Sequence, residues 1–310
     1  MAGPHVRRPR RRVDGVLLLD KPRGLSSNAA LQRAKRLYAA EKAGHTGTLD
    51  PLATGLLPIC FGDATKFAQA LLDARKKYVA TVRFGIATTT GDAEGDIVRE
   101  EPATFTRAEL ERMLPRFIGT IAQVPPLHSA LKFEGRNYYE YARAGIDIPR
   151  APRHVEIDAI VLVDWSPPVA TLHVACSKGT YIRVLAEDLG AALGSCAHLI
   201  ALRRTAAGPF TIDGAIALEA LEAIGTADRD ALLMPVHAPL AGMPRLDVDA
   251  DTARALLQGR IGRAPGSVAG RYCCFDIDRR FLGVVEVDAA GLRAVRLVAA
   301  TTPAGQPAQE

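Results

Sequence analysis

The stretch that most constrains the fold is residues 44–66, which read GHTGTLDPLATGLLPICFGDATK. Four glycines and two prolines make its backbone turn tightly, and most side chains between them are apolar. Asp50 lies in the middle of these turns, and Asp63 is the only other acid in the run. A single acid on a rigid apolar loop is the layout expected when one carboxylate must be held against a reacting atom.

A structural role for Asp50 is the alternative. An Asp followed by Pro is also a common helix start, with Asp as the N-cap and Pro at the first helical position. Pro51 favours the extended backbone that an N-cap needs at Asp50. Because an N-cap lies at an exposed helix end, the catalytic and the capping roles are compatible.

Composition indicates a globular protein of one large domain and a smaller one. The 310 residues are 48% hydrophobic and 24% charged, and no apolar run approaches the roughly 20 residues of a membrane span. The apolar run at residues 16–19 is too short for a signal peptide. The five cysteines form no C-x-x-C pair and have no His at zinc-ligand spacing, so we expect buried thiols, no metal and a cytoplasmic protein.

Charge is unevenly distributed along the chain. Five arginines within residues 7–12 account for the net charge of +5. Residues 21–46 then carry six Lys or Arg against one Glu, whereas residues 213–251 carry eight acids against two Arg. This segregation predicts a local basic face for an anionic polymer.

Hydrophobic periodicity predicts a mixture of strands and helices. We expect strands at residues 13–19, 77–86, 155–164, 169–176 and 197–206, and helices at residues 26–38, 64–74, 106–119 and 181–193. Residues 125–153 form an aromatic and basic excursion that suits either ligand gripping or a plain surface insertion. Near the end, a helix at 250–258 and three strands at 271–276, 281–287 and 292–298 predict a small β-rich domain.

Arg183 is the second candidate for chemistry. It falls in the first turn of the helix expected at 181–193, where the helix dipole already presents partial positive charge. An anionic partner would explain a cation there, and either a phosphate or Asp50 could serve. The alternative is an exposed arginine without a partner. If Asp50 is partly buried, burial would raise its pKa and a paired guanidinium would keep it ionised.

Three aromatic rings lie beside basic residues. Tyr78 and Tyr181 could offer stacking surfaces for an unpaired base, or they could simply pack in the core. His45 lies within the glycine-rich segment and could stack, form hydrogen bonds or remain solvated. Because the chain lacks the motifs of P-loop, dinucleotide-binding, zinc deaminase and serine hydrolase proteins, these residues indicate a cofactor-free enzyme or a binding module with one special acid.

The order of several short motifs resembles the TruB family of pseudouridine synthases, which modify uridine 55 in the T-loop of bacterial tRNA. The likeness covers about residues 13–210 and is carried by LDKP at 19–22, GHTGTLDPLATG at 44–55, KY at 77–78, SALK at 129–132, YAR at 141–143, SKGTYIR at 177–183 and LRR at 202–204. His128 departs from the Tyr or Phe usual in the family.

The resemblance implies a role for each matched residue. Asp50 would be the nucleophile, attacking either C6 of the ring or C1′ of the ribose, without cofactor or metal. Tyr78 would stack on the flipped base and Arg183 would pair with Asp50. The substrate-binding residues would be Tyr181 and Leu202 in the pocket, His45 in the space that the base leaves, and Lys21 and Lys66 on the RNA backbone.

The resemblance also implies the architecture: an α+β fold with a mixed, largely antiparallel sheet flanked by helices, and a small PUA-like RNA-binding domain. The expected boundaries are a disordered tail at 1–12, the catalytic domain at 13–243 with an RNA-gripping insertion at 125–153, the PUA-like domain at 244–300 and a second disordered tail at 301–310. The partner would be the T-arm of tRNA, bound by a monomer.

Two rival hypotheses stay open at this point. The first is an RNA-binding or RNA-folding protein of the same shape without catalytic activity. The second is a metal-dependent nuclease or glycosidase that uses Asp50 with Asp63 or Asp92.

Overall fold

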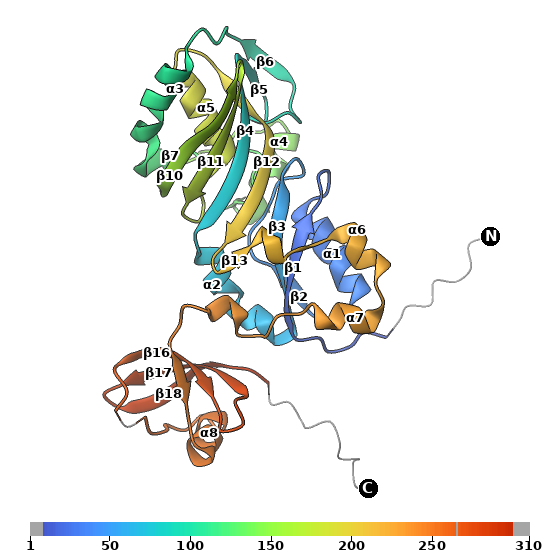
Figure 1. Cartoon of the computed structure of the whole chain (residues 1–310), viewed down its shortest axis with the longest axis vertical. Helices are drawn as coiled ribbons and strands as arrows, with labels where there is room; N and C mark the ends of the chain where they lie inside the picture. The colour runs from blue at the N-terminus through green and yellow to red at the C-terminus, as the bar shows by residue number, and fades with distance from the viewer. Residues whose placement is uncertain (1–8, 265, 300–310) are drawn as a thin grey trace, which may run out of the picture.

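The computed structural model describes residues 9–264 and 266–299 (Figure 1). The catalytic-domain strands are β1 Gly15–Lys21, β2 Ala43–His45, β3 Thr54–Phe61, β4 Lys76–Phe84, β5 Ile86–Thr88, β6 Ile97–Glu100, β7 Gly119–Gln123, β8 Lys132–Phe133, β9 Arg136–Asn137, β10 Arg153–Ser166, β11 Val169–Cys176, β12 Ala197–Ala207, β13 Phe210–Thr211 and β14 Ile216–Ala217. The helices are α1 Ser27–Leu37, α2 Ala68–Asp73, α3 Arg107–Met113, α4 Tyr138–Arg143, α5 Ile182–Ala192, α6 Leu218–Ala223 and α7 Thr226–Ala231.

One mixed sheet organises the catalytic domain. Among the described residues it has ten strands, in the order β14-β1-β3-β12-β4-β11-β10-β7, with β2 on β3 and β13 on β12. The pairs β1/β14 and β3/β12 are parallel and the other pairs are antiparallel. The expected mixed, largely antiparallel sheet is therefore confirmed, and helices flank it (Figure 1).

The core forms where apolar strands are covered on both faces. β3 is buried from Gly55 to Phe61, as expected for a central strand of the sheet. Its neighbour β1 contributes Leu17 and Leu19, and α1 covers them with Ala30, Leu31 and Ala34. Ser26 caps α1 by accepting a hydrogen bond from the amide of Ala29, which confirms the helix start expected there.

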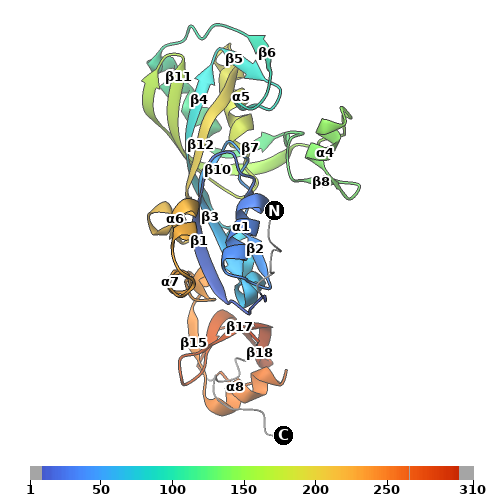
Figure 2. The same ribbon diagram turned by 90° about the vertical axis from the view of Figure 1, so that its right-hand side faces the viewer.

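The segment 125–153 leaves the sheet as a projecting arm. It contains the hairpin β8–β9 and the short helix α4, and Figure 2 shows it extending from the body on the side where α1 lies. A small cluster of Tyr138, Tyr141 and Ile148 holds the arm together. An excursion with an aromatic helix was expected here and is confirmed.

A separate β-rich domain follows the catalytic domain. Its sheet has the order β15-β16-β17-β18, with β15 Arg245–Asp247, β16 Gly270–Phe275, β17 Phe281–Asp288 and β18 Gly291–Leu297, and α8 Ala250–Leu257 packs beside β18. This domain was expected, except for the three-residue β15. Such a short segment shows no period of its own and pairs only through its parallel neighbour β16.

The N-terminal boundary differs from the expectation. Residues 1–8 and 300–310, which include most of both expected tails, lie outside the described residues. Arg11 and Arg12 were also assigned to the disordered tail, and this was wrong. Arg11 pairs with Asp230 and donates to the carbonyl of Tyr38, while Arg12 pairs with Asp14 and Asp63. Asp230 and Asp63 are far from the two arginines in sequence, so nothing in the sequence indicated these pairs.

All five cysteines are buried free thiols, as expected. Within residues 9–264 and 266–299, we find no helix with both the length and the apolar character to cross a bilayer.

Gly55 provides a test of the contact between β3 and β12. Its φ is +99°, and an added Cβ would lie 2.3 Å from the carbonyl oxygen of Arg204. Gly55→Ala should therefore lower the free energy of unfolding in urea by more than about 3 kcal/mol. Gly44→Ala, where the added Cβ meets nothing within 4 Å, is the control and should change it by less than about 0.5 kcal/mol. Equal stability of the two variants would contradict the packing described here.

Candidate active site

The loop before β3 is pinned on both sides of Asp50. Leu49 and Leu52 are buried in the core, and the amide of Gly24 donates to the carbonyl of Pro51 at 2.7 Å. No helix follows Asp50: the amide of Ala53 bonds to the carbonyl of Asp50 and strand β3 then begins. The alternative role of Asp50 as a helix N-cap is therefore wrong.

Arg204 supports the same loop from the neighbouring strand β12. Arg204 is 1% exposed, and its guanidinium donates to the carbonyls of Leu56 at 2.7 Å and Gly47 at 3.3 Å. Gly47 has a φ of +106°, which favours glycine. The sequence contained Arg204 in a matched motif, but nothing in the pattern indicated that its side chain would support the loop of Asp50.

Arg183 joins the elements that surround Asp50. Its Nε lies 3.0 Å from Asp50 Oδ2 and 3.7 Å from Asp92 Oδ2, so the expected pairing with Asp50 is present in the structure. Its two terminal nitrogens donate to the carbonyls of Thr90 and His128, each at 2.7 Å. A buried guanidinium requires such complete pairing, because an unpaired charge in the interior is costly.

The pKa of Asp50 reflects a balance of opposing effects. Burial raises it above the ordinary value for aspartate, the positive charge of Arg183 lowers it, and the negative charge of Asp92 raises it again. The side chain remains 38% exposed, so the carboxylate can still be reached from solvent. The site therefore presents an accessible carboxylate whose ionisation depends on Arg183.

A cleft of about 650 Å³ opens over this carboxylate. Its walls come from the start of α1, the loop before β3, the polar loop at 89–96, the projecting arm and α5, and the side chains that face it include Asp50, Arg183, His45, Glu94, Tyr139 and Arg143. His45 Nδ1 is buried without a hydrogen-bond partner among the described residues. Arg143 lies over the ring of Tyr139, 5.4 Å from its centroid.

The other aromatic candidates lie close to the cleft. Tyr78 on β4 is paired in register with Arg204 of β12, and burial raises its pKa. Tyr181 precedes α5, and its amide donates to the side chain of Gln123 at 3.0 Å. Arg204 supports the loop of Asp50, and Tyr181 lies two residues before Arg183, so both tyrosines come from elements that border Asp50. Leu202 is buried on β12 in the same core.

Two lysines that were expected on the RNA backbone make contacts within the protein. Lys21 is fully buried and donates to the carbonyls of Pro22 and Leu25, and burial lowers its pKa to about 8. Lys66 pairs with Asp63 and donates to the carbonyl of Leu297 in the C-terminal domain. The turn after β1 and the domain junction thus occupy the two ammonium groups, and a contact of either lysine with an RNA backbone stays a prediction.

The structural role of Asp92 was not predicted, because the rival hypothesis of a metal-dependent enzyme used it as a metal ligand. Asp92 is 3% exposed, lies beside Arg183, and accepts hydrogen bonds from Thr90 Oγ1 and the amide of Glu94. The dense Thr, Asp and Glu content of residues 88–96 was the only available signal. Asp63, the other acid considered, contacts Arg12, Lys66 and the amide of Ala299 at the domain junction.

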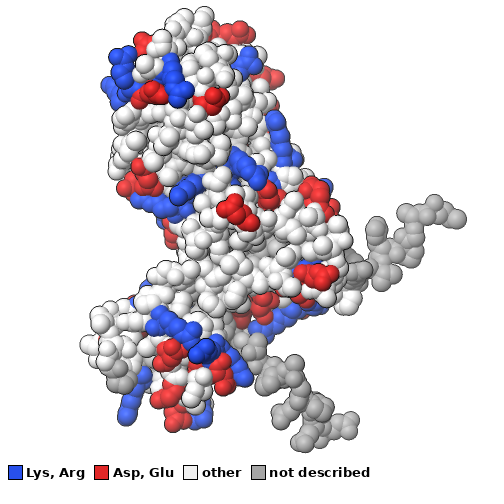
Figure 3. Space-filling view, viewed as in Figure 1, with Lys and Arg blue, Asp and Glu red and all other residues white. Residues whose placement is uncertain are grey.

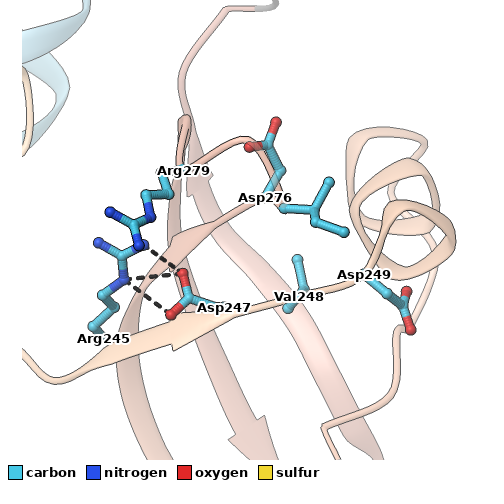
Figure 4. Close-up of a pocket in the computed structure, with 7 residues that line it drawn as sticks. Arg245, Asp247, Val248, Asp249, Asp276 and Arg279 are labelled. Carbon is cyan, nitrogen blue, oxygen red and sulfur yellow. Dashed lines mark hydrogen bonds and ion pairs between the residues drawn. The ribbon is translucent and has the colours of Figure 1, made fainter.

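Another hollow, of about 730 Å³, lies in the C-terminal domain (Figure 4). Arg245 lines this hollow. Its guanidinium donates hydrogen bonds to the carboxylate of Asp247 and lies 4.0 Å from the ring centroid of Phe275. The hollow is larger than the cleft over Asp50, but two further acids, Asp249 and Asp276, line it. This internal charge pairing makes it a poor site for an anion.

Lys and Arg side chains gather in patches on the face drawn in Figure 3, where the catalytic domain narrows and on the C-terminal domain. Asp and Glu side chains lie among these patches. A single basic face, as predicted from the charge distribution, is therefore not a feature of this side of the molecule.

Comparison with known proteins identifies relatives of the entire chain. A protein named tRNA pseudouridine synthase B from Burkholderia mallei is 52% identical over 302 residues, which cover 95% of this chain and 97% of that protein. Proteins of the same name from Azoarcus sp. and Ralstonia nicotianae are 55% and 58% identical, over 95% and 82% of this chain and 98% and 82% of theirs.

Solved structures share the fold. A protein in a Cbf5-Nop10-Gar1 complex aligns with a TM-score of 0.67 and 27% identity, over 88% of this chain and 78% of that chain. A chain from an H/ACA RNP bound to a substrate RNA containing 2′-deoxyuridine aligns with a TM-score of 0.68 at 23% identity, over 92% and 85% of the two chains. The second likeness concerns the fold alone.

Two family models cover most of the catalytic domain. The N-terminal domain of the TruB family pseudouridylate synthases matches residues 35–182, and the C-terminal domain of tRNA pseudouridylate synthase B matches residues 183–241. Together with relatives more than 50% identical over nearly the whole chain, these matches show that the protein belongs to the TruB family of pseudouridylate synthases.

Proposed function

We propose that the protein converts uridine 55 in the T-loop of tRNA to pseudouridine, with Asp50 as the nucleophile. The observation that carries the proposal is the ion pair between Arg183 and Asp50, 3.0 Å long, beneath an open cleft. The ion pair keeps the carboxylate charged and oriented, which are the two requirements for a nucleophile of this type. Family membership supports both the substrate and the reaction.

The reaction is an isomerisation, so it consumes no second reactant. Asp50 attacks the uridine at C6 or at C1′, and the bond between N1 and C1′ breaks. The detached uracil rotates and rejoins the ribose through C5, after which C5 loses its proton and N1 holds one. Asp50 is released unchanged, and no electrons are transferred to a cofactor.

The target base must leave its stack before Asp50 can reach it. Tyr78 and Tyr181 are suitable to contact the extruded base, because Tyr78 is paired in register with Arg204, which supports the Asp50 loop, and Tyr181 lies two residues before Arg183. His45 is suitable to fill the vacated space in the RNA, since it lines the cleft and its Nδ1 has no hydrogen-bond partner among the described residues. The projecting arm, with Tyr139 and Arg143 on the cleft, would close over the T-loop.

The remaining assignments extend this proposal. The enzyme would act as a cytoplasmic monomer on the T-arm of tRNA. The four-stranded C-terminal domain would serve as a PUA-like RNA-binding domain that contacts the tRNA outside the T-loop.

The first prediction concerns Asp50→Asn. The amide keeps the shape of the side chain but cannot act as a nucleophile, so pseudouridine formation should fall by at least about 10⁴-fold. Binding of tRNA should stay within about threefold of wild type. The measurement is incubation with an unmodified tRNA transcript, mapping of the modified nucleotide and a parallel filter-binding titration. Surviving activity would remove Asp50 as the nucleophile, and a product outside the T-loop would overturn the substrate.

The second prediction concerns pH. Since only the carboxylate form of Asp50 reacts, activity should be lost as the pH falls through its raised pKa. Arg183→Gln removes a charge that lowers this pKa, so the acidic limb of the single-turnover rate should move to higher pH. Asp92→Asn removes a charge that raises it, so the limb should move to lower pH. Shifts of both variants in the same direction would contradict the proposed electrostatics.

The third prediction separates an isomerase from a metal-dependent nuclease or glycosidase. Enzyme treated with EDTA and assayed on a folded transcript should retain its full rate, and the RNA should remain one intact strand. Cleaved RNA, or activity that returns only when a divalent ion is added, would favour the rival.

A further inference from the structure

Ser27 contacts the backbone of the residue immediately before Asp50. Its Oγ accepts a hydrogen bond from the amide of Leu49 at 2.7 Å and donates one to the carbonyl of Leu49 at 3.0 Å. Ser27 is 1% exposed, so water does not compete for these groups. In the described part of the chain, this hydroxyl is the hydrogen-bond partner of both backbone atoms of Leu49.

This contact does not belong to the capping of α1. Ser26 performs that function through a hydrogen bond from the amide of Ala29 at 3.1 Å, and its side chain is exposed. The Ser27 hydroxyl instead binds the loop before β3. There it takes the place of the neighbouring backbone with which Leu49 would form hydrogen bonds in a strand. Two adjacent serines at the start of α1 thus have different tasks.

The loop is fixed again just after Asp50, by the hydrogen bond from the amide of Gly24 to the carbonyl of Pro51. Lys21 braces the turn that supplies both contacts, because its ammonium group binds the carbonyls of Pro22 and Leu25. The backbone on both sides of Asp50 is therefore fixed by hydrogen bonds to residues 24–27. The Asp50 carboxylate, in contrast, is held from the other side of the cleft by Arg183.

We propose that Ser27 is a positioning residue for the reaction: by binding both backbone groups of Leu49, it fixes the backbone of Asp50 so that the carboxylate meets Arg183 and the target nucleotide. This inference rests on the proposed function of Asp50. Besides the ion pair between Arg183 and Asp50, the reaction would then also require the hydrogen bonds between Ser27 and Leu49. A displacement of about 1 Å of a reacting group can cost about 100-fold in rate, so losing the anchor should affect catalysis strongly.

The test compares Ser27→Ala with the matched control Ser26→Ala. Ser27→Ala should lower the single-turnover rate of pseudouridine formation by about 10- to 100-fold and change the dissociation constant for tRNA less than about twofold. Ser26→Ala weakens the helix cap at the edge of the cleft without touching Leu49, so its rate should exceed that of Ser27→Ala by at least about fivefold. If Ser27→Ala does not fold, Ser27→Cys keeps a side chain of similar size with a poor donor and acceptor and carries the same expectation.

Hydrogen exchange of the Leu49 amide supplies a readout that does not depend on catalysis. This amide should be protected in wild type and in Ser26→Ala, and should exchange at least about tenfold faster in Ser27→Ala. Equal rates of reaction for the two serine variants, or a loss confined to tRNA binding, would overturn the positioning role. Activity in Asp50→Asn would instead overturn the proposed function, while the exchange measurement would still decide whether Ser27 anchors Leu49.

Discussion

The buried guanidinium of Arg183 is the interaction on which the site depends. At 5% exposure it must be fully paired, and it achieves this with two carboxylates and the carbonyls of Thr90 and His128. These partners come from the glycine-rich loop, the polar loop at 89–96 and the base of the projecting arm. Pairing one side chain therefore fixes the relative positions of three segments that are far apart in sequence.

Charge balance explains how an aspartate can remain ionised at this position. Asp50 and Asp92 bring two negative charges, which Arg183 and Lys21 oppose. Burial disfavours the charged forms of Asp50 and Lys21, and the attraction between the opposite charges offsets part of that cost. Lys21 contributes to this balance: its charge lowers the pKa of Asp50, and its hydrogen bonds shape the turn that anchors the loop.

Features that depend on a local residue pattern or on a specific motif could be predicted from the sequence. Strands β1, β4, β10, β11 and β12, helices α1, α2, α3 and α5, the arm with its aromatic helix and the pairing of Arg183 with an anion follow from periodicity, caps and helix position. The central strand β3 was not predicted, because it lies in the glycine-rich segment. The sequence could not predict contacts made by the fold itself. Lys21 was expected on an RNA backbone and Arg11 in a disordered tail, because their carbonyl and carboxylate partners are defined only in three dimensions. Asp92 was considered as a possible metal ligand for the same reason.

The most direct test of the central claim is a structure of the protein bound to a T-arm RNA. If Asp50 is the nucleophile, one of its carboxylate oxygens should lie about 3–3.5 Å from C6 or C1′ of an extruded uridine, with Arg183 still paired to it. An extruded uridine whose nearest carboxylate belongs to Asp92 or Glu94, or a uridine that remains stacked in the RNA, would contradict the account.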